Sequence, residues 1–472
     1  MAEPTRVDAV SRRTVLKGLA GAAGLVSIPA IIAACSSSGS STAPSAAAPS
    51  AAAPSAAAPS AAASAGASAA ASAATGSVTF GSNYSNKDTD TKAMQAVVDA
   101  FTQKTGIAVK VNTVDHNTFQ DQISPYLQGT PDDVFTWFAG YRMRFFADQG
   151  LATDISDLWG KIGGNFSDAF KASSTGNDGK QYFVPFYNYP WVVIYRKSVF
   201  QDKGYTVPKT WDEFKTLATK MKADGLTPLA FGDKDGWPAM GTFDILDMRV
   251  NGYQYHIDLM KGAQKWTDPK TAAVFEAWKQ LLPFNGDISA ALGRTWQDTA
   301  NLLVQKKAGM YFLGTFAGQQ ATEKADHDDL DFFPFPTLGT QYDSELGIDA
   351  PIDGFMMTAK SPTLAADKDA SLAFLEYLSS GPAQITFLVA NPNSVAAGKD
   401  ADTSGYSAFQ KKSAEIIAGS KAIAQFLDRD TDPGFAKQMQ SFLQTWLTNP
   451  DQDMTAFLKS IQDFWDSLNI SS

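Results

Sequence analysis

Hydrophobic and polar positions divide the chain into three stretches with different patterns. Residues 18–34 form an apolar run behind basic residues, and residues 36–77 contain only small, uncharged residues. From residue 78 onward, hydrophobic positions recur at regular spacing. Regular spacing is typical of strands and helices that bury one face. The sequence therefore predicts a folded part that runs from residue 78 to residue 472.

Strands and helices alternate at the start of this folded part. Residues 78–80 alternate as a short strand, residues 94–101 carry hydrophobic side chains at helical spacing, and residues 107–111 alternate again. This order predicts a three-layer α/β domain with a mostly parallel sheet. Ligands bind such sheets beyond the carboxyl ends of the strands, and Asn83 and Tyr84 follow the first strand.

Similar signals recur farther along the chain. Residues 134–138 and 192–195 are expected to be strands, and Thr210 and Glu213 have the spacing of a capping box at the start of a helix. Four tryptophans occupy helical patterns and are expected to pack in or on helices: Trp211, Trp278, Trp446 and Trp465.

The N-terminal segment has the features of an export signal. Its basic residues precede an apolar run that is shorter than a membrane span requires. Residues 11–17 resemble the twin-arginine signal, with Val15 where that signal usually has phenylalanine, so the choice between that route and general export stays open. An uncleaved signal anchor would leave the rest of the chain on the same extracytoplasmic side.

Cys35, the only cysteine in the chain, directly follows the apolar run and two alanines. This pattern resembles the lipobox of bacterial lipoproteins, which implies that residues 1–34 are a signal peptide and that Cys35 is lipidated. The protein is then expected to be anchored by lipid at the extracytoplasmic face of the cell membrane. The alternative is a small buried cysteine within an apolar helix.

Residues 35–77 are expected to be a disordered tether. They consist of Ser, Ala, Pro, Gly and Thr after Cys35, and a Pro-Ser-Ala-Ala-Ala unit recurs every five residues. Such a segment has no large apolar side chain to bury, so nothing offsets the entropy cost of ordering it. Fully extended, it would reach on the order of 130 Å. The sequence leaves open whether the tether is glycosylated.

Charge and rare residues narrow the function classes. The formal net charge is −10, and no lysine or arginine cluster supplies the basic surface that nucleic acid requires. His116, His256 and His327 are scattered without metal-ligand spacing, so we expect no metal and no cofactor. Three aspartates at alternating positions resemble the start of a calcium-binding loop. Pro433 and Met439, however, occupy the positions of the glycine and the bidentate glutamate that such a loop requires. Those aspartates are Asp428, Asp430 and Asp432.

Several motifs then occur in a characteristic order along residues 78–472. They are the strand-plus-helix start, Pro-Asp-Asp-Val-Phe at 131–135, Tyr-Arg-Lys at 195–197, Val-Pro-Lys-Thr-Trp-Asp-Glu-Phe at 207–214, Lys-Lys-Ala-Gly-Met at 306–310, Phe-Pro at 335–336 and Ala-Phe-Leu-Glu-Tyr-Leu at 373–378. Together they resemble the extracellular solute-binding lipoproteins of ABC importers, in the sugar-binding group similar to maltose-binding protein. Arg196 departs from the asparagine that this family commonly has after the tyrosine.

The resemblance implies a periplasmic-binding-protein-like α/β fold with two lobes around a ligand cleft. Crossing hinge segments are expected at 185–190 and 333–336, with a return at 379–382. The N-terminal lobe would comprise residues 78–186 plus 337–380, and the C-terminal lobe residues 187–336 plus 381–472. The implied protein is a monomer and not an enzyme. It captures a small carbohydrate by hinge closure and delivers it to the permease subunits of an ABC transporter.

The candidate ligand-binding residues follow from the chemistry of sugars. Aromatic rings cover the C–H faces of a pyranose, while polar side chains bond its hydroxyls. The aromatic candidates are Trp137, Trp191, Trp237, Trp296 and Phe316, and the polar candidates are Asn83, Tyr84, Asp244, Arg249, Asp353 and Gly354. For each tryptophan, packing beneath a loop is about as plausible as stacking on a ligand, and each polar residue has an alternative as a turn or surface group. Trp237, between Gly236 and Pro238, is the leading candidate.

Two other function classes stay open at this point. A glycoside hydrolase needs a pair of carboxylates, which a chain with 49 acidic residues can supply. A glycan-binding surface adhesin would be retained on insoluble polysaccharide instead of closing around a small sugar.

The lipobox gives the first testable prediction. Cys35→Ala is expected to release the protein from membranes or to block its maturation, because stable anchoring requires the acyl chains on the cysteine. Lipid labelling and membrane fractionation check this expectation. Unchanged labelling and retention in the variant would contradict the assignment of Cys35 as a lipidation site.

Overall fold

The computed structural model describes residues 76–86 and 89–468. The predicted signal peptide, Cys35 and nearly all of the predicted tether lie outside the described residues. Among the described helices, none combines the length and the hydropathy needed to cross a bilayer.

The first sheet has six strands, and its strands β1 (Ser77–Ser82) and β2 (Ala108–Thr113), with the helix between them, confirm the predicted strand–helix–strand start. In spatial order these strands are β11 (Val395–Ala396), β4 (Phe183–Asn188), β10 (Ile352–Met357), β3 (Val134–Phe138), β1 (Ser77–Ser82) and β2 (Ala108–Thr113). Strand β1 pairs in parallel with β2 and with β3. Strand β10 pairs antiparallel with β3 and β4, and β11 pairs antiparallel with β4. The expectation of a mostly parallel sheet is therefore wrong for this half, because β10 enters from a distant part of the chain.

The second sheet has four strands and receives the chain directly from the first. In spatial order they are β6 (Thr227–Ala230), β7 (Ala308–Gly314), β5 (Trp191–Arg196) and β8 (Leu330–Phe333). Only Tyr189 and Pro190 separate β4 of the first sheet from β5 of the second. The chain returns between β8 and β10, and this connection contains β9 (Ile348–Asp349), which pairs with β12 (Ile423–Ala424).

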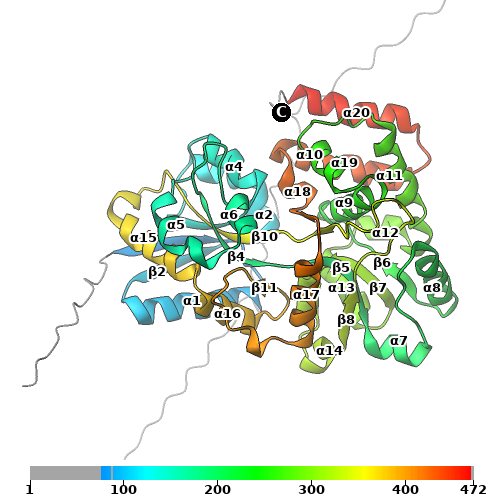
Figure 1. Ribbon diagram of the computed structural model, residues 1–472, viewed down its shortest axis with the longest axis horizontal. Coiled ribbons are helices and arrows are strands. Elements are labelled where there is room, and N and C mark those ends of the chain that lie inside the picture. Colours follow the sequence, from blue (N-terminus) through cyan, green and yellow to red (C-terminus); the bar gives the residue numbers. More distant parts are fainter. Residues whose placement is uncertain (1–75, 87–88, 469–472) are drawn as a thin grey trace, which may run out of the picture. The chain divides into compact units, whose positions relative to one another are not determined.

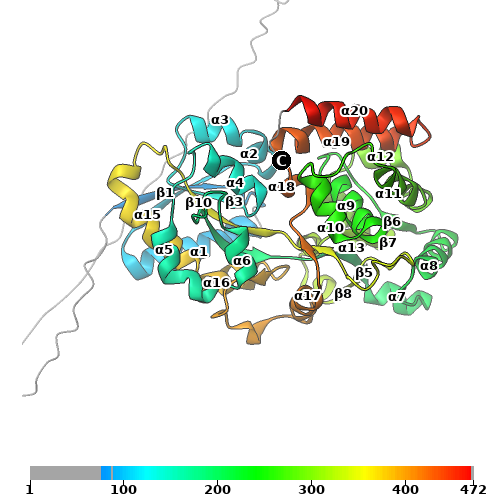
Figure 2. The same cartoon turned by 45° about the horizontal axis from the view of Figure 1, so that its top comes forward.

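Helices surround each sheet (Figure 1, Figure 2). Those around the first sheet are α1 (Asp90–Thr105), α2 (His116–Asp121), α3 (Ile123–Gln128), α4 (Tyr141–Asp148), α5 (Ser156–Ile162), α6 (Asp168–Ser173), α15 (Leu364–Leu378) and α16 (Gly381–Ala390). Those on the side of the second sheet are α7 (Lys197–Lys203), α8 (Trp211–Ala223), α9 (Pro238–Asn251), α10 (Tyr253–Met260), α11 (Pro269–Lys279), α12 (Ile288–Leu292), α13 (Trp296–Val304), α14 (Lys324–Asp328), α19 (Pro433–Thr448) and α20 (Met454–Ser467). Two further helices are α17 (Ala408–Gly419) and α18 (Leu427–Asp430).

Local sequence signals set several of these boundaries. Helix α1 ends at Gly106, whose φ of 78° is a left-handed conformation that glycine adopts without a steric penalty. The predicted capping box at Thr210 and Glu213 is present at the start of α8. The four tryptophans expected in helices lie in α8, α11, α19 and α20.

The elements near residue 380 extend the first group of helices beyond the expected lobe boundary. Helix α16 packs against α1, and β11 joins the first sheet. The sequence had placed residues 381–396 in the second lobe. Helix α17 then packs against the second sheet, where Phe409 contacts Phe332 with 4.8 Å between ring centroids. The assignment of two lobes stays a prediction, but these contacts favour a return after residue 396.

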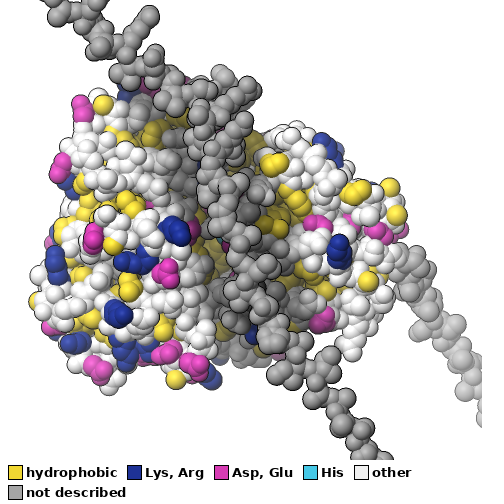
Figure 3. Space-filling view, turned by 180° about the vertical axis from the view of Figure 1, so that it is seen from behind, with side chains coloured by type: hydrophobic (Ala, Val, Ile, Leu, Met, Phe, Trp, Pro, Cys, Tyr) yellow, Lys and Arg dark blue, Asp and Glu magenta, His cyan; other side chains and the backbone are white. Residues whose placement is uncertain are grey.

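Charges of both signs are spread over the surface. Lysine and arginine side chains lie among aspartates and glutamates on the face shown in Figure 3. This interspersed pattern differs from the single-sign patch that typifies surfaces binding nucleic acid.

A buried polar cluster joins α9 and α10 beneath the second sheet. His256 Nδ1 lies 3.0 Å from Asp247 Oδ2, and His256 Nε2 lies 3.8 Å from Asp244 Oδ1. All three side chains are fully buried. Burial by itself lowers the pKa of His256, but the hydrogen bond to Asp247 and the charge of Asp244 outweigh it and raise the pKa to about 9.

This shift predicts how stability depends on pH. A histidine whose pKa rises on folding stabilises the fold fully below its ordinary pKa of 6.5 and loses that contribution as the pH passes about 9. We expect the free energy of unfolding to fall between these values by on the order of 1 kcal/mol or more. Denaturant unfolding at several pH values measures it. His256→Asn, which retains a donor for Asp247 but cannot titrate, should flatten this slope, and an equal slope in that variant would contradict the assignment.

Candidate functional site

A cavity of about 430 Å³ lies among elements that belong to both sheets. This volume falls within the range of small-molecule binding sites. The loop after β1 and helices α1 and α2 contribute residues from the side of the first sheet. Strand β5, helices α13 and α18 and the residue that precedes α9 contribute residues from the side of the second. The short connection from β4 to β5 passes through the cavity wall at Tyr189. The site is therefore built from segments far apart in the sequence.

One wall of the cavity is aromatic, and we refer to it as the aromatic wall. It comprises Trp191, Trp237, Trp296, Phe316 and Phe426. Trp191 meets Trp237 edge to face with 6.2 Å between ring centroids, and it stacks on Phe426 at 4.9 Å. Phe316 meets Trp296 edge to face at 5.1 Å. These contacts fix the rings before any ligand binds, so little side-chain entropy remains to be lost on binding.

The aromatic wall arises from ordinary element boundaries. Trp191 begins β5, Trp237 is the N-cap residue of α9 with Pro238 after it, and Trp296 begins α13. Phe316 lies in a 3₁₀ turn, η3 (Thr315–Gln320), that follows β7. Residues at the ends of elements point their side chains beyond the packed layers. These rings line the cavity at the edge of the hydrophobic core, in which Trp191 and Trp237 are buried.

Asp90 anchors a polar group in the lining of the same cavity. Its Oδ1 accepts hydrogen bonds from Gln319 Nε2 at 3.0 Å and from Asn391 Nδ2 at 2.8 Å. Burial raises the pKa of Asp90 to about 7, although a hydrogen bond from Thr89 acts in the opposite direction. The carboxyl group can therefore both accept and donate hydrogen bonds near neutral pH.

Asp353 and Arg429 form a buried ion pair in the same cavity. Arg429 Nη1 donates to Asp353 Oδ1, and the guanidinium carbon lies 3.7 Å from the centroid of the Phe138 ring. Burial raises the pKa of Asp353, while Arg429 and the hydroxyls of Tyr187 and Tyr189 act to lower it. The pair supplies fixed donors and acceptors with little net charge.

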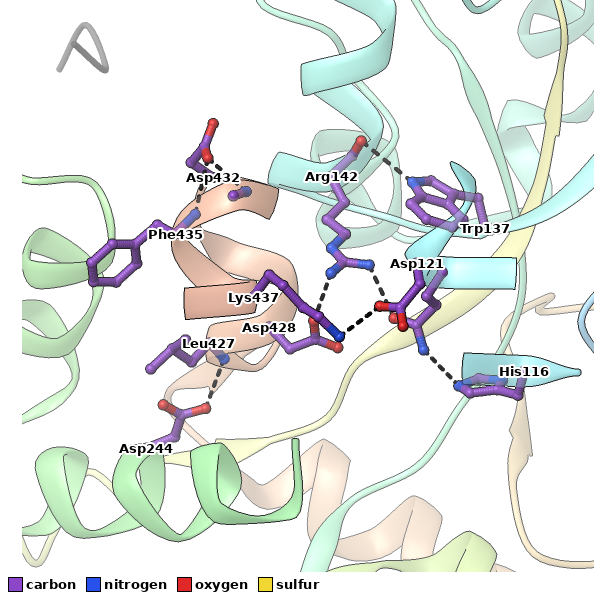
Figure 4. Close-up of polar contacts among 12 residues, drawn as sticks. His116, Asp121, Trp137, Arg142, Asp244, Leu427, Asp428, Asp432, Phe435 and Lys437 are labelled. Atoms are coloured by element: carbon purple, nitrogen blue, oxygen red, sulfur yellow. Dashed lines mark hydrogen bonds and ion pairs between the residues drawn. The ribbon is translucent and has the colours of Figure 1, made fainter. Parts of the chain in front are cut away.

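A second buried ion pair supports the wall near α2. Arg142 Nη2 donates to Asp428 Oδ1 at 2.8 Å, and Arg142 Nη1 donates to Gln120 Oε1 at 3.0 Å (Figure 4). Gln120 Nε2 lies 2.8 Å from His116 Nε2. Burial, together with the nearby charge of Arg429, lowers the pKa of His116 to about 4. The imidazole is therefore neutral at physiological pH.

The structure brings seven of the sequence candidates together around this cavity. They are Asn83, Tyr84, Trp191, Trp237, Trp296, Phe316 and Asp353. The two residues after β1 are in the place expected for a ligand-binding loop. Trp237 Nε1 and Trp191 Nε1 are buried and have no hydrogen-bond partner among the described residues, so two indole donors are available near the cavity.

Two other candidates, both in strands of the first sheet, do not line the cavity. Trp137 is 1% exposed in β3, and its Nε1 donates to the carbonyl of Arg142 at 3.3 Å. Gly354 lies in β10, where a Cβ atom would come 2.0 Å from the carbonyl oxygen of Val184. The tryptophan therefore packs in the core, and the glycine allows close approach of two strands.

Two charged candidates also lie away from the cavity. Asp244 belongs to the buried cluster with His256, and its Oδ2 accepts from the Leu427 amide at 2.7 Å. Arg249 donates to the carbonyls of Gly347 and Phe335 at 2.7 and 3.1 Å. Both lie in α9, which carries Trp237 near its first turn and buries almost every later residue.

Several polar residues that line the cavity were not among the candidates from the sequence. They include Asp90, His116, Asn117, Gln120, Gln319, Asn391, Asp428 and Arg429.

Asp428 was considered as a calcium ligand, but the structure pairs it with Arg142, while Asp432 caps α19. Within residues 76–86 and 89–468, no group of three or more acidic, histidine or cysteine residues has the geometry of a metal site. No local pattern in the sequence marks the polar residues that line the cavity, because segments far apart along the chain bring them together. Tyr187 and Tyr189, next to the crossing between the sheets, also line the cavity.

Comparisons with known proteins agree with this geometry. The family model described as bacterial extracellular solute-binding protein matches residues 85–385. A solved bacterial solute receptor, AcbH, described as having an exclusive preference for β-D-galactopyranose, is 47% identical, with a TM-score of 0.79 over 83% of this chain and 99% of that chain. An ABC transporter extracellular-binding protein from Pyrococcus horikoshii is 28% identical over 70% of this chain and 74% of its own. The diacetylchitobiose-binding protein DasA from Streptomyces coelicolor is 29% identical over 50% of this chain and 55% of its own.

Proposed function

The chain belongs to the family of bacterial extracellular solute-binding proteins, and we propose that its ligand is a small neutral carbohydrate. Members of this family bind solutes and are not enzymes, so the glycoside hydrolase alternative is set aside. The fold is the two-sheet α/β fold of periplasmic binding proteins, as in the similar solved structures.

One observation carries the proposal, namely that the aromatic wall and a set of hydrogen-bonding groups line the same cavity. A pyranose ring has apolar C–H faces and a rim of hydroxyls. The rings of Trp191, Trp237 and Phe316 suit the faces, while Asp90 and Asp353 suit the hydroxyls. Hydrogen-bonding groups buried in the cavity discriminate strongly against a ligand that cannot pair them.

The pairing and protonation of the acidic side chains in the cavity favour a neutral ligand. Asp353 is paired with Arg429, Asp428 is paired with Arg142, and burial raises the pKa of Asp90 to about 7. A charged solute would need an unpaired group of opposite sign, because a desolvated charge without a partner is costly.

The similar proteins narrow the class of carbohydrate that we propose as the ligand. AcbH, which is 47% identical and is covered almost completely, is described with an exclusive preference for β-D-galactopyranose. We therefore propose a hexopyranose monosaccharide, with D-galactose as the first sugar to test. DasA, a more distant relative, is named for binding diacetylchitobiose.

The mode of action follows from the family and the topology. The chain crosses between the sheets at residues 189–190 and returns between β8 and β10, which gives hinges around which the two sheets can close on a ligand. We propose that a lipid at Cys35 anchors the protein outside the cell membrane. As a monomer it would deliver the sugar to an ABC permease. A cavity lined from both sheets fits this role better than that of an adhesin, which needs an open surface for a polymer.

The ligand-binding proposal predicts a specific effect of Trp237→Ala. Removal of a desolvated indole is expected to weaken D-galactose binding by on the order of 2 kcal/mol, which is roughly thirtyfold in affinity. Calorimetric titration measures the affinity, and denaturant unfolding measures the stability of the same samples.

The unaltered protein is expected to bind D-galactose without forming a product. If it responded to no hexose, the proposed function would be contradicted.

Trp465→Ala is the matched control for Trp237→Ala. Trp465 is 7% exposed in α20 and packs edge to face on Phe435 at 4.7 Å, outside the residues that line the cavity. Its removal is expected to lower stability by about 3–5 kcal/mol, as for a core tryptophan, with unchanged affinity in the folded fraction. If Trp237→Ala behaved in the same way, with normal affinity and lowered stability, Trp237 would be a packing residue only.

Hinge closure gives a further prediction. The radius of gyration of the folded part should decrease when a sugar that binds is added, because the two sheets move together to exclude water. Small-angle scattering with and without the sugar measures this change, and a sugar without calorimetric binding is the control. A constant radius with a bound sugar would identify a rigid binding module.

A further inference from the structure

Arg142 lies behind the cavity wall and connects helices from the two sides. It stands in α4, on the side of the first sheet, and its side chain is buried. Its two terminal nitrogens donate to Gln120 in α2 and to Asp428 in α18 (Figure 4). Helix α18 packs against α9 and α19, on the side of the second sheet, and also contacts α4. The guanidinium therefore bridges the two sides of the cavity.

Both acceptors of Arg142 line the cavity, whereas Arg142 does not. Gln120 in turn bonds His116, another residue of the cavity lining. A planar guanidinium can donate to two acceptors in fixed directions at once, which an ammonium group cannot do with the same geometry. Arg142 can thus set the positions of Asp428, Gln120 and His116 without touching the ligand.

Helix α18 is also held from its other side. The amide of Leu427 donates to Asp244 Oδ2 at 2.7 Å, and Asp244 belongs to α9 (Figure 4). In both views of the ribbon, α18 lies between α4 and α9 (Figure 1, Figure 2). Because α18 is attached to α9, a movement of the two sheets apart would pull Asp428 away from Arg142.

A second ion pair spans the same edge of the cavity. Lys437 Nζ in α19 lies 2.8 Å from Asp121 Oδ1 in α2, but these side chains are 61% and 54% exposed. Exposed pairs contribute little because water competes for both charges. The Arg142 and Asp428 side chains are 8% and 6% exposed, so separation of that pair leaves two poorly solvated charges. The Arg142–Asp428 pair therefore contributes more to this link than the Lys437–Asp121 pair does, and it acts beside the buried Arg429–Asp353 pair.

We propose that Arg142 is a positioning residue that couples separation of the two sheets to release of the ligand. In the arrangement described here its bridge is formed, and opening of the cavity has to break it. The bridge thereby prolongs the lifetime of the bound sugar more than it accelerates capture. This proposal rests on the proposed function, since it requires a ligand that leaves when the two sides separate.

Arg142→Lys in the full chain, with D-galactose as the probe, tests the proposal. Lysine retains the charge but loses the two-pronged geometry. We expect the dissociation constant to rise about fivefold to tenfold, in line with typical coupling between sites, mainly through faster dissociation. Stopped-flow kinetics and calorimetry measure these quantities. Arg142→Gln should have a larger effect because it also removes the charge. If Arg142→Gln fails to fold, Arg142→Lys still decides the test.

Two lysine variants serve as controls. Lys459→Gln removes an exposed pair with Asp463 inside α20 and should leave affinity and dissociation unchanged. Lys437→Gln removes the exposed pair on the same edge, and its effect should stay below about twofold and disappear at high salt. An unchanged dissociation rate in Arg142→Lys, or a loss confined to the association rate, would overturn the proposal.

Hydrogen exchange measured without ligand tests the Arg142 bridge independently of the proposed function. Amide hydrogen exchange in residues 116–121 and 427–430 should be faster in Arg142→Lys than in the unaltered chain, with no change in Lys459→Gln. If the unaltered chain bound no sugar, the proposed function would be contradicted. The comparison of hydrogen exchange would still test whether Arg142 forms the bridge. Equal exchange in Arg142→Lys and the unaltered chain would overturn it.

Discussion

Buried charge has to be paired, and this requirement joins the two halves of the molecule at the cavity. Arg429 belongs to α18, on the side of the second sheet, and Asp353 belongs to β10 of the first sheet. Their side chains are 7% and 11% exposed, so each would be costly without the other. The Arg142–Asp428 pair meets the same requirement one residue away along α18. These pairs connect the two sides beside the cavity, and Asp353, Arg429 and Asp428 also line it.

Pairing also determines what the cavity can hold. Once Arg429 and Asp353 neutralise each other, the cavity offers directed hydrogen bonds without a strong net field. Burial raises the pKa of Asp90 to about 7, so this carboxyl can donate as well as accept. A sugar hydroxyl has the same dual capacity. Electrostatics and the aromatic wall therefore favour the same ligand by separate physical routes: a neutral molecule with apolar faces and a polar rim.

The sequence predicted local features better than it predicted distant contacts. The strand before Asn83, the helix end at Gly106 and the capping box at Thr210 depend on neighbouring residues, and all three are present. The antiparallel entry of β10 depends on pairing between residues more than two hundred positions apart, for which periodicity gives no signal. For the same reason Asp428 resembled a calcium ligand, because its partner Arg142 lies 286 residues earlier. The aromatic candidates line the cavity where they lie at the start of an element or in a turn, as Trp237 and Phe316 do, whereas Trp137 lies within a strand and packs in the core.

Phe426 shows how the aromatic wall and the ion pairs depend on each other. Its φ of 102° is rare for a residue with a side chain, and such a conformation costs about 1–3 kcal/mol. The surrounding contacts offset this cost, because the Phe426 carbonyl accepts from the amides of Arg429 and Asp430 at 2.7 and 2.9 Å. Its ring is stacked on Trp191, so the same backbone that orients Arg429 also places part of the aromatic wall. A movement of α18 that separated Arg429 from Asp353 would shift this ring as well. The polar and aromatic contacts of a bound sugar would then be lost together, which makes the binding site cooperative.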